Sequence, residues 1–334
     1  MGRKLVYQTL EFDNPERAPR DIWILPWARM NYKDEVNKLT DTFEQDVRNA
    51  GGFTKKSAVE KGEMYEIGEY TDAWGCVFEN IQRGVQGEVK NPLVCDEEWE
   101  DADNVYFPRE FLEVDKEKVN AFCKDTDKFI FSGYCARPFE RLQFIRGSEN
   151  LYMDLVLKPD GLLEFIKKMH DFELKIMETW AQTDVDALMF MDDWGAQNNL
   201  LINPGTWLEI FKPMYRSFCD IAKAYNKKIF MHSDGNILKI YPHLIEIGVD
   251  ALNSQVFCMG LDQLEKYKGQ ITFWGEIDRQ HILPEGTPAQ VEEAVRAFKN
   301  TLWHNGGCFA QCEFGPGARV ENVFKVFDTW NKVV

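Results

Sequence analysis

The sequence predicts a (β/α)8 barrel of the TIM type, with an N-terminal extension over the mouth of the barrel. From about Thr126 onward, short apolar runs alternate with segments in which apolar residues recur at helical spacing. Such alternation indicates parallel strands joined by right-handed helical crossovers. No GxGxxG or P-loop pattern opens any of the expected helices, which argues against an open nucleotide-binding sheet. A chain of 334 residues is long enough for one barrel.

Residues 1–125 are the less regular part of a single domain that we expect to span residues 1–334. Residues 21–27, DIWILPW, predict a first strand that stops at a proline, and residues 31–49 predict an acidic surface helix. The aromatic and acidic segment 65–80 has glycine breaks, which predict a hairpin folded over the main body. This part therefore supplies the extension and the first strands.

Residues 126–334 contain the regular strand–helix units. The clearest helix covers residues 159–183, where Leu163, Ile166 and Met169 begin an apolar stripe on one face. Further helices are expected at residues 238–247, 261–267 and 288–303, and from Pro204 and Val320 onward. Strands are expected at residues 128–134, 187–195, 228–236, 249–255, 271–278 and 306–315.

Composition and charge narrow the classes of partner. The formal net charge of −16 argues against a nucleic acid or an anionic membrane surface as partner. No apolar run reaches the length of about 18 residues that a transmembrane helix needs, and residues 1–10 lack the apolar core of a signal peptide. The eight cysteines are scattered without CxxC pairs, as in cytosolic proteins with free thiols. We therefore expect a cytoplasmic location.

Polar side chains stand at the ends of successive expected strands. In a barrel the carboxyl ends of the strands meet at one mouth, where active sites form. Each of these residues alone can serve a turn, because Asp and Asn are common at strand ends. Their succession makes a shared site the better interpretation. The residues are Asp192, Asp193, His232, Asp234, Asn253, Gln255, Glu276, Asp278, Gln311, Cys312 and Glu313.

The central stretch is residues 228–236, KIFMHSDGN, in which an apolar run ends in His232 and Asp234. Residues two apart on a strand point to the same face, so this imidazole and this carboxylate can converge on a metal or on a proton-transfer site. Together with Glu276 and Cys312 they form a mixture of nitrogen, oxygen and sulfur donors that suits zinc. A Cys–His nucleophilic pair with a carboxylate partner is the competing interpretation.

Aromatic and basic residues near these strand ends are candidates for substrate binding. Trp194 and Trp274 either line an apolar pocket or pack in the core. Arg137 and Arg146 flank the segment after the strand at residues 128–134. They can bind a substrate carboxylate, or they can take part in ion pairs with the protein's own acids.

The strand ends also carry a resemblance to a known family. The sequence resembles the uroporphyrinogen decarboxylase-like superfamily, and within it the corrinoid-linked methyltransferases, from about Lys128 to the C-terminus. The resemblance implies a barrel with its active site at the carboxyl ends of the strands. It rests, in order along the chain, on MDDWGAQNNLLINPGTW, FKPMYRSFCDIAKAYNKKIFMHSDGNI, LIEIGVDALNSQ, ITFWGEIDRQHILPEGT and GGCFAQCEFGPGA.

Two branches of the superfamily differ in what they need. The resemblance implies that a true decarboxylase would bind a porphyrinogen with several carboxylates through an N-terminal arginine-rich motif. Here Arg29 is the only arginine between Ile22 and Tyr32, so that cationic cradle is missing. Decarboxylation of such a porphyrinogen is therefore not expected.

The methyltransferase branch holds zinc on a His-x-Cys motif and on a distant cysteine. This chain has His232 at the start of the motif, Asp234 in place of its cysteine, and Cys312 close to the distant cysteine. The resemblance thus implies His232, Cys312 and Glu276 as the leading zinc ligands, with Glu276 replacing the missing thiolate. Asp234 is expected to be a ligand or a partner of one.

The predicted function is that of an enzyme, a zinc-dependent methyltransferase. The resemblance implies transfer of a methyl group between a small substrate and the cobalt of a corrinoid (cobalamin) carried by a partner protein. Methoxylated aromatics or similar ethers are the favoured donors, which makes the reaction an O-demethylation. The alternatives are a cofactor-independent decarboxylase or lyase and a non-catalytic corrinoid- or tetrapyrrole-binding protein. A homodimer is compatible with the sequence.

The remaining residues at the strand ends receive roles from this prediction. We expect Asp192 and Asp193 to be catalytic groups that position substrate or handle protons. We expect the substrate, or the side chains of the corrin, to be bound by Trp194, Asn253, Gln255, Trp274 and Arg146.

Overall fold

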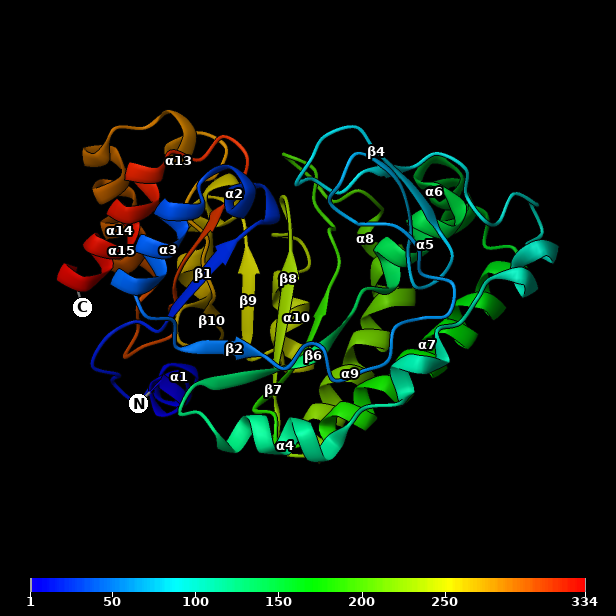
Figure 1. The fold of residues 1–334 in the computed structure, drawn as a ribbon, viewed down its shortest axis with the longest axis horizontal. Coiled ribbons are helices and arrows are strands. Elements are labelled where there is room, and N and C mark those ends of the chain that lie inside the picture. The colour runs from blue at the N-terminus through cyan, green and yellow to red at the C-terminus, as the bar shows by residue number, and fades with distance from the viewer. Residues whose placement is uncertain (1, 334) are drawn as a thin grey trace.

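The computed structural model describes residues 2–333, and in this part of the chain the helices surround a barrel of parallel strands (Figure 1). The barrel strands are β1 (Arg20–Ile24), β2 (Val47–Asn49), β6 (Phe129–Ala136), β7 (Ala187–Met191), β8 (Lys228–Ser233), β9 (Ala251–Ser254), β10 (Thr272–Phe273) and β11 (Ala310–Phe314). Six of them form one sheet in the order β10-β9-β8-β7-β6-β2, and the other two pair as β1-β11. Each of these pairings is parallel.

Backbone hydrogen bonds close the barrel at both seams between these two sheets. At one seam, the amide of Asp46 donates to the carbonyl of Arg20 in β1 at 3.0 Å, and its carbonyl accepts from Phe129 in β6 at 2.9 Å. At the other seam, the amide of Phe273 in β10 donates to Gly307, just before β11, at 2.9 Å. The predicted (β/α)8 barrel is therefore confirmed.

Large aromatic side chains fill the interior of the barrel. Phe131 and Phe230 lie edge to face with ring centroids 4.8 Å apart, and Trp274 stacks on Phe131 at 5.3 Å. These are favourable arrangements of aromatic rings. Val6 and Leu10 of α1 (Gly2–Leu10) join the same cluster and close the amino-terminal end of the barrel. The interior is therefore a packed core, as in other barrels of this kind.

Helices cover the outside of the barrel with their apolar faces. In α7 (Asp160–Ala181) Ile166 and Met169 of the predicted stripe are buried, whereas Leu163 is 40% exposed and lies at the edge of the buried face. Within residues 2–333, no helix combines the length and apolarity that crossing a membrane requires. The other helices are α2 (Pro26–Asn31), α3 (Lys33–Thr42), α4 (Lys116–Lys124), α5 (Pro138–Arg146), α6 (Ser148–Leu157), α8 (Pro204–Thr206), α9 (Lys212–Ala224), α10 (Tyr241–Ile247), α11 (Val256–Met259), α12 (Leu261–Leu264), α13 (Ile282–Glu285), α14 (Pro288–Leu302), α15 (Val320–Val333), the 3-10 turns η1 (Glu100–Asn104), η2 (Arg109–Leu112) and η4 (Glu265–Tyr267), and the π-helical turn η3 (Trp207–Phe211).

A small antiparallel sheet of β3 (Gly68–Thr71), β4 (Val77–Asn80) and β5 (Glu88–Val89) lies outside the barrel. β3 and β4 form the hairpin expected from the sequence. Figure 1 places it on the side toward which β8 and β9 point, close to α5. Arg141 of α5 anchors it, because its guanidinium pairs with Asp72 and lies over the Trp74 ring at 5.2 Å. The N-terminal part thus extends over the mouth side of the barrel, as predicted.

Several strands and helices are shorter than the sequence indicated, and two of them differ most. The helix expected at residues 31–49 is α3, which ends at Thr42. The chain then forms β2, because Val47 packs in the barrel interior beside Phe129. The strand expected at residues 271–278 is reduced to β10. The chain leaves the strand conformation at Gly275, whose φ is +84°.

We predict that Asp46→Ala weakens the seam between β1 and β2. The buried Asp46 carboxylate accepts from the Arg20 amide at 2.8 Å and from two nitrogens of Arg17 at 2.6 and 2.8 Å. Removing it leaves these donors unpaired, so the free energy of unfolding should fall by about 2–4 kcal/mol in urea denaturation. Glu44→Ala, which removes an exposed partner of Lys128, should cost less than about 1 kcal/mol. Equal losses in the two variants would contradict this role of Asp46.

Candidate functional site

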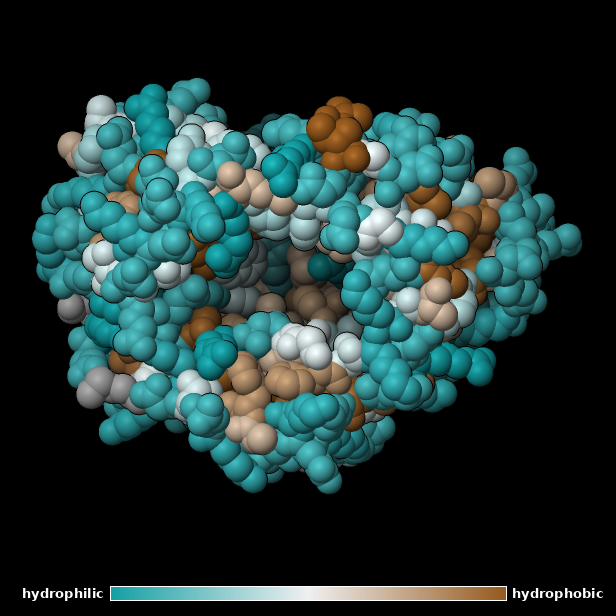
Figure 2. Space-filling view, viewed as in Figure 1, coloured by the Kyte–Doolittle hydropathy of each residue, from teal (hydrophilic) through white to brown (hydrophobic). Residues whose placement is uncertain are grey.

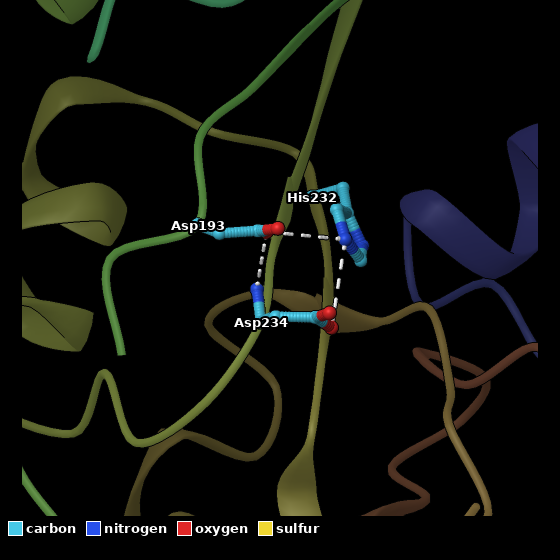
Figure 3. A group of neighbouring side chains, drawn as sticks. All are labelled: Asp193, His232 and Asp234. Atoms are coloured by element: carbon cyan, nitrogen blue, oxygen red, sulfur yellow. Dashed lines mark hydrogen bonds and ion pairs between the residues drawn. The ribbon is translucent and has the colours of Figure 1, made fainter. Parts of the chain in front are cut away.

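Three side chains meet at the carboxyl ends of the neighbouring strands β7 and β8 (Figure 3). His232 is the second-last residue of β8, Asp193 lies just after β7, and Asp234 follows β8. Nε2 of His232 lies 3.5 Å from Oδ1 of Asp193 and 3.6 Å from Oδ1 of Asp234. One ligand atom from each residue lies within 4.8 Å of the other two, a spacing that can hold a metal ion. Figure 2 shows that the surface is hollowed in the centre of the view, near the place where Figure 1 shows β8 and β9.

Close contact between two loops holds the two aspartates together. The amide of Gly195 donates to the carbonyl of Asp234 at 3.0 Å, and the amide of Asp234 donates to Oδ1 of Asp193 at 2.9 Å. A Cβ atom on Gly195 or Gly235 would lie 2.3 or 2.0 Å from backbone atoms of the opposite loop. Gly235 also has a φ of +74°. A larger residue at either position would therefore force the loops, and the carboxylates they carry, apart.

Asn253 on β9 fixes the state of the His232 ring. Its amide nitrogen donates to the carbonyl of Trp274, so its oxygen is the atom that faces Nδ1 of His232, at 2.7 Å. Because this oxygen can only accept, Nδ1 carries a proton. Nε2 is left facing the two aspartates, which is how a second partner orients a histidine that binds a metal.

Charge explains the protonation of the trio. Burial lowers the pKa of His232, but the hydrogen bond with Asp193 and the charges of Asp234 and Asp193 outweigh burial and raise this pKa to about 9. Burial raises the pKa of Asp193, yet its hydrogen bond with His232 and the charge of that ring bring it below its usual value. At neutral pH, His232 is therefore a cation between two carboxylates.

Arg279 gathers further carboxylates beside the trio. Its guanidinium contacts Asp234, lies 2.9 Å from Oε2 of Glu313, and lies 3.6 Å from Oε1 of Glu276. Burial raises the pKa of Glu276 to about 8; Arg279 opposes this, while Asp234 and Glu313 add to it. Burial also raises the pKa of Glu313. Glu276, Arg279 and Gln255 line a cavity of about 100 Å³ at the mouth.

The residues at the mouth fit a divalent metal ion. In the contacts described above, three carboxylates, those of Asp193, Asp234 and Glu313, face only two cationic side chains, His232 and Arg279. His232 is charged only while it holds a proton, and a dication at Nε2 would replace that proton. One imidazole nitrogen and two carboxylate oxygens are donor types found in catalytic zinc sites. They also suit other divalent ions of intermediate softness.

Cys312 and Glu276, which the sequence predicted as further ligands, do not belong to this trio. Phe309, just before β11, and the alternate residues Gln311 and Glu313 within it face the barrel interior or its mouth. Cys312 faces the other way, in the core between the strands and the helices. Burial, together with the charges of Glu276 and Glu313, raises the pKa of its thiol well above the usual value, which disfavours the thiolate that binds metals. Its role as a ligand stays a prediction.

The two aspartates predicted as catalytic lie in different surroundings. Asp192 is fully buried and accepts from the Phe139 amide at 3.0 Å, from the Glu140 amide at 2.8 Å, and from the Tyr215 hydroxyl. It thus holds the start of α5, and burial raises its pKa well above the usual value. Asp193 reaches the mouth, with 36% of its side chain exposed.

Three residues predicted to bind substrate have other contacts in the structure. Trp194 is fully buried and stacks on Phe139 with centroids 3.9 Å apart. Arg146 is buried and donates to Asp154 at 2.7 Å, which is the ion-pair alternative considered from the sequence. Trp274 fills the barrel interior. Substrate contact by these residues stays a prediction, since Trp194 and Trp274 belong to the core and Arg146 to a buried ion pair.

Sequence reasoning missed Arg279 and Trp23. Arg279 could have been found as the basic residue three positions after Glu276 in a series of acidic strand ends. The ring of Trp23 lies 5.1 Å from that of His232, and its indole nitrogen donates to Asp21 at 2.9 Å. Alternation along the first strand places Trp23 and Asp21 on one face, but only barrel closure reveals that this face meets His232.

Sequence comparison identifies the family of this chain. A sequence model of the uroporphyrinogen decarboxylase (URO-D) family matches residues 71–333. The chain belongs to the uroporphyrinogen decarboxylase family. The match includes the whole Asp193–His232–Asp234 trio, and it confirms the predicted family. A comparison with curated proteins gives no significant match.

Solved structures show how this member of the uroporphyrinogen decarboxylase family relates to other barrels. A methyltransferase from Methanosarcina mazei is similar over 99% of this chain and 98% of its own, with a TM-score of 0.65 and 13% identity, which shows a shared fold. A B12-independent methionine synthase from a Shewanella species is 11% identical over 66% of each chain, with a TM-score of 0.41. A Gloeophyllum trabeum endo-β-1,4-xylanase is 10% identical over 96% of this chain and 99% of its own, with a TM-score of 0.45. The last two likenesses are too weak to bear on function.

We predict that His232 titrates near pH 9 in protein stripped of metal by a chelator. Because this folded-state pKa lies above the unfolded value of about 6.5, the stabilisation is complete below pH 6.5 and is lost as the pH rises through 9. The loss should be on the order of 3 kcal/mol in urea denaturation and should be absent in His232→Gln. NMR of the imidazole measures the pKa directly. A wild-type value near 6.5 would contradict the charge balance described above.

We predict that Gly235→Ala disrupts the trio as well as the backbone. Ala at a positive φ costs about 1 kcal/mol or more, and the overlap with Gly195 adds to this cost. Gly52→Ala is the matched control, since Gly52 has a φ of +86° with nothing within 4 Å of an added Cβ. Gly235→Ala should lose clearly more stability than Gly52→Ala, and it alone should lower the pKa of His232. Equal losses of stability and an equal pKa of His232 in the two variants would show that the contact between the loops does not hold the trio together.

Proposed function

We propose that this chain is a zinc-dependent methyltransferase that moves a methyl group between a small substrate and the cobalt of a corrinoid carried by a partner protein. The favoured donors are methoxylated aromatics or similar ethers. Membership of the uroporphyrinogen decarboxylase family supports this proposal, as does the fold shared with the Methanosarcina mazei methyltransferase.

The observation that carries the proposal is the trio at the barrel mouth. Asp193, His232 and Asp234 would hold the zinc, since their ligand atoms converge and their charge favours a cation. Bound zinc supplies a Lewis acid that polarises an ether oxygen or stabilises the oxygen left after the methyl group departs. Asn253 keeps Nε2 of His232 turned toward the two aspartates.

Glu276 is the residue that we expect to deliver a proton in this reaction. It is 3% exposed, its pKa is raised to about 8, and it lines the mouth cavity, so it is a neutral acid at pH 7. In O-demethylation the bond between methyl carbon and ether oxygen breaks, and the oxygen keeps the electron pair. The carboxylic acid of Glu276 can protonate that oxygen and is left as a carboxylate that Arg279 stabilises.

A metal-free decarboxylase or lyase is the second candidate, and one observation favours it. Arg279 contacts Asp234, so one of the three ligand residues already has a cationic partner. In this alternative, the His232 imidazolium is the acid and Asp193 is the base at the mouth. The two candidates differ in whether the chain needs zinc.

Metal content tests the proposal. Protein purified without chelator should contain about one zinc per chain, and His232→Ala and Asp234→Asn should lose it. His243→Ala is the control, because His243 lies on α10 away from the mouth. Cys312→Ser should keep its zinc, because the thiol faces the helices; loss of zinc in this variant would restore the ligand set predicted from the sequence. A wild type that binds no zinc when zinc is supplied would favour the metal-free candidate.

A zinc-binding assay tests the role of Asn253, and an activity assay tests that of Glu276. Asn253→Ala should weaken zinc binding by about 10- to 100-fold, because it frees the His232 ring. Glu276→Gln should keep its zinc but lower kcat by about 10²- to 10⁴-fold. The readout is release of the phenol from a methoxybenzene in the presence of reduced cobalamin. Full activity of Glu276→Gln would remove Glu276 as the proton donor.

A further inference from the structure

A second cavity, of about 460 Å³, lies between the small antiparallel sheet and the barrel wall. β3 and the turn after it form one side, and the end of β6, α5 and α7 form the other. This volume falls within the range of about 300–1,000 Å³ that is typical of small-molecule sites. The lining residues include none of the Asp193–His232–Asp234 trio, so the cavity is separate from the candidate metal centre.

Aromatic rings form much of the wall of this cavity. Trp74 is 2% exposed, and the guanidinium of Arg141 lies 5.2 Å above its ring and 5.4 Å above that of Phe144. The ring of Phe111 lies 5.8 Å from that of Tyr134. All five side chains line the cavity. Flat apolar surfaces of this kind favour a planar aromatic ligand.

Polar groups with unused hydrogen-bonding capacity line the same cavity. Arg137 has five N–H groups; its guanidinium donates to the sulfur of Met191 at 3.1 Å and lies 3.6 Å from Glu140, so donors remain for a ligand. Glu173 is 1% exposed, and within residues 2–333 its Oε2 has no hydrogen-bond partner. Burial raises the pKa of Glu173 to about 8 against the charge of Arg141 and the hydrogen bonds from the Arg137 backbone and the Tyr134 side chain, so it is a neutral donor at pH 7.

Strand register places Arg137 on the rim of the barrel mouth. Ala136 in β6 pairs with Phe190 in β7, and Met191 pairs with His232 in β8. Arg137 follows Ala136 and is therefore level with Met191, which its guanidinium contacts. One end of the cavity thus lies about one strand away from the candidate metal centre.

We propose that this cavity is a binding site for an aromatic carboxylic acid. The carboxylate would pair with the planar guanidinium of Arg137, a charge-assisted contact of the strong kind, and would accept from the carboxylic acid of Glu173. The ring would lie against Trp74, Phe111 and Phe144. Arg141 already pairs with Asp72 and serves to hold the wall. The proposal stands whether or not the chain transfers methyl groups.

Calorimetric titration of chelator-treated protein with 3-methoxybenzoate tests this proposal without the metal centre. We expect one site per chain, and at least about 10-fold weaker binding of the neutral 3-methoxybenzyl alcohol, which lacks the carboxylate. Arg137→Gln should weaken binding of the acid by about 10-fold or more. Glu173→Gln, which keeps a neutral donor of similar size, should change it by less than about 3-fold, whereas Glu173→Leu should weaken it clearly.

Two further variants keep the result interpretable. Ala73 lines the cavity, so Ala73→Phe should fill it and abolish binding without removing a charge. Arg83→Gln is the control, because Arg83 sits beside the same small sheet but pairs with Glu66 outside the cavity. Absence of binding at about 10 mM acid, equal binding of the alcohol, or unchanged binding in both Arg137→Gln and Ala73→Phe would overturn the proposal. Zinc binding by protein that fails these tests would leave the proposed methyl transfer intact.

Discussion

Closure of the parallel sheet determines where the chemical groups of this protein lie. The seam between β1 and β2 depends on the backbone and the carboxylate of Asp46, which also hold Arg17 and Arg20. Once the ring is closed, residues from distant parts of the chain share the rim, so that Trp23 from the first strand lies against His232 from the fifth of the eight. Aromatic side chains and α1 fill the rest of the barrel interior. The polar and charged groups therefore gather at the mouth.

At the mouth, opposite pKa shifts separate the roles of neighbouring acids. Glu276 is held neutral by burial, whereas Asp193 is held ionised by the histidine beside it. Sites in which similar groups are pushed to different protonation states are typical of acid–base catalysis. Arg279 links the two sets of groups through Asp234 and Glu276. The same arrangement therefore supports metal-assisted methyl transfer, with Glu276 as the proton donor, and leaves a metal-free acid–base route as its competitor.

The fold could be predicted from strand–helix alternation because each unit of the barrel repeats the same local pattern. The spacing of two residues predicted that His232 and Asp234 meet on one face of their strand. The place of Asp193 after a strand predicted that it lies at the mouth. Sequence could not tell Asp192 from Asp193, since adjacent residues on a strand end point to opposite sides. The orientation of Cys312 was hidden for the same reason: a shift of one residue in register exchanges the two faces of a strand. Short strands such as β2, with three residues, carry too little pattern to be recognised.

The contact between Gly195 and Gly235 gives the mouth a property that side chains alone would not provide. The backbones of the two loops are in direct contact there and are joined by hydrogen bonds. Main-chain packing then sets where the backbones of Asp193 and Asp234 lie relative to each other, so only rotation about side-chain bonds can change the gap between the two carboxylates. Carboxylates that extend from backbone segments held this close together suit a small ion with short metal–ligand bonds better than a large, adaptable one such as calcium.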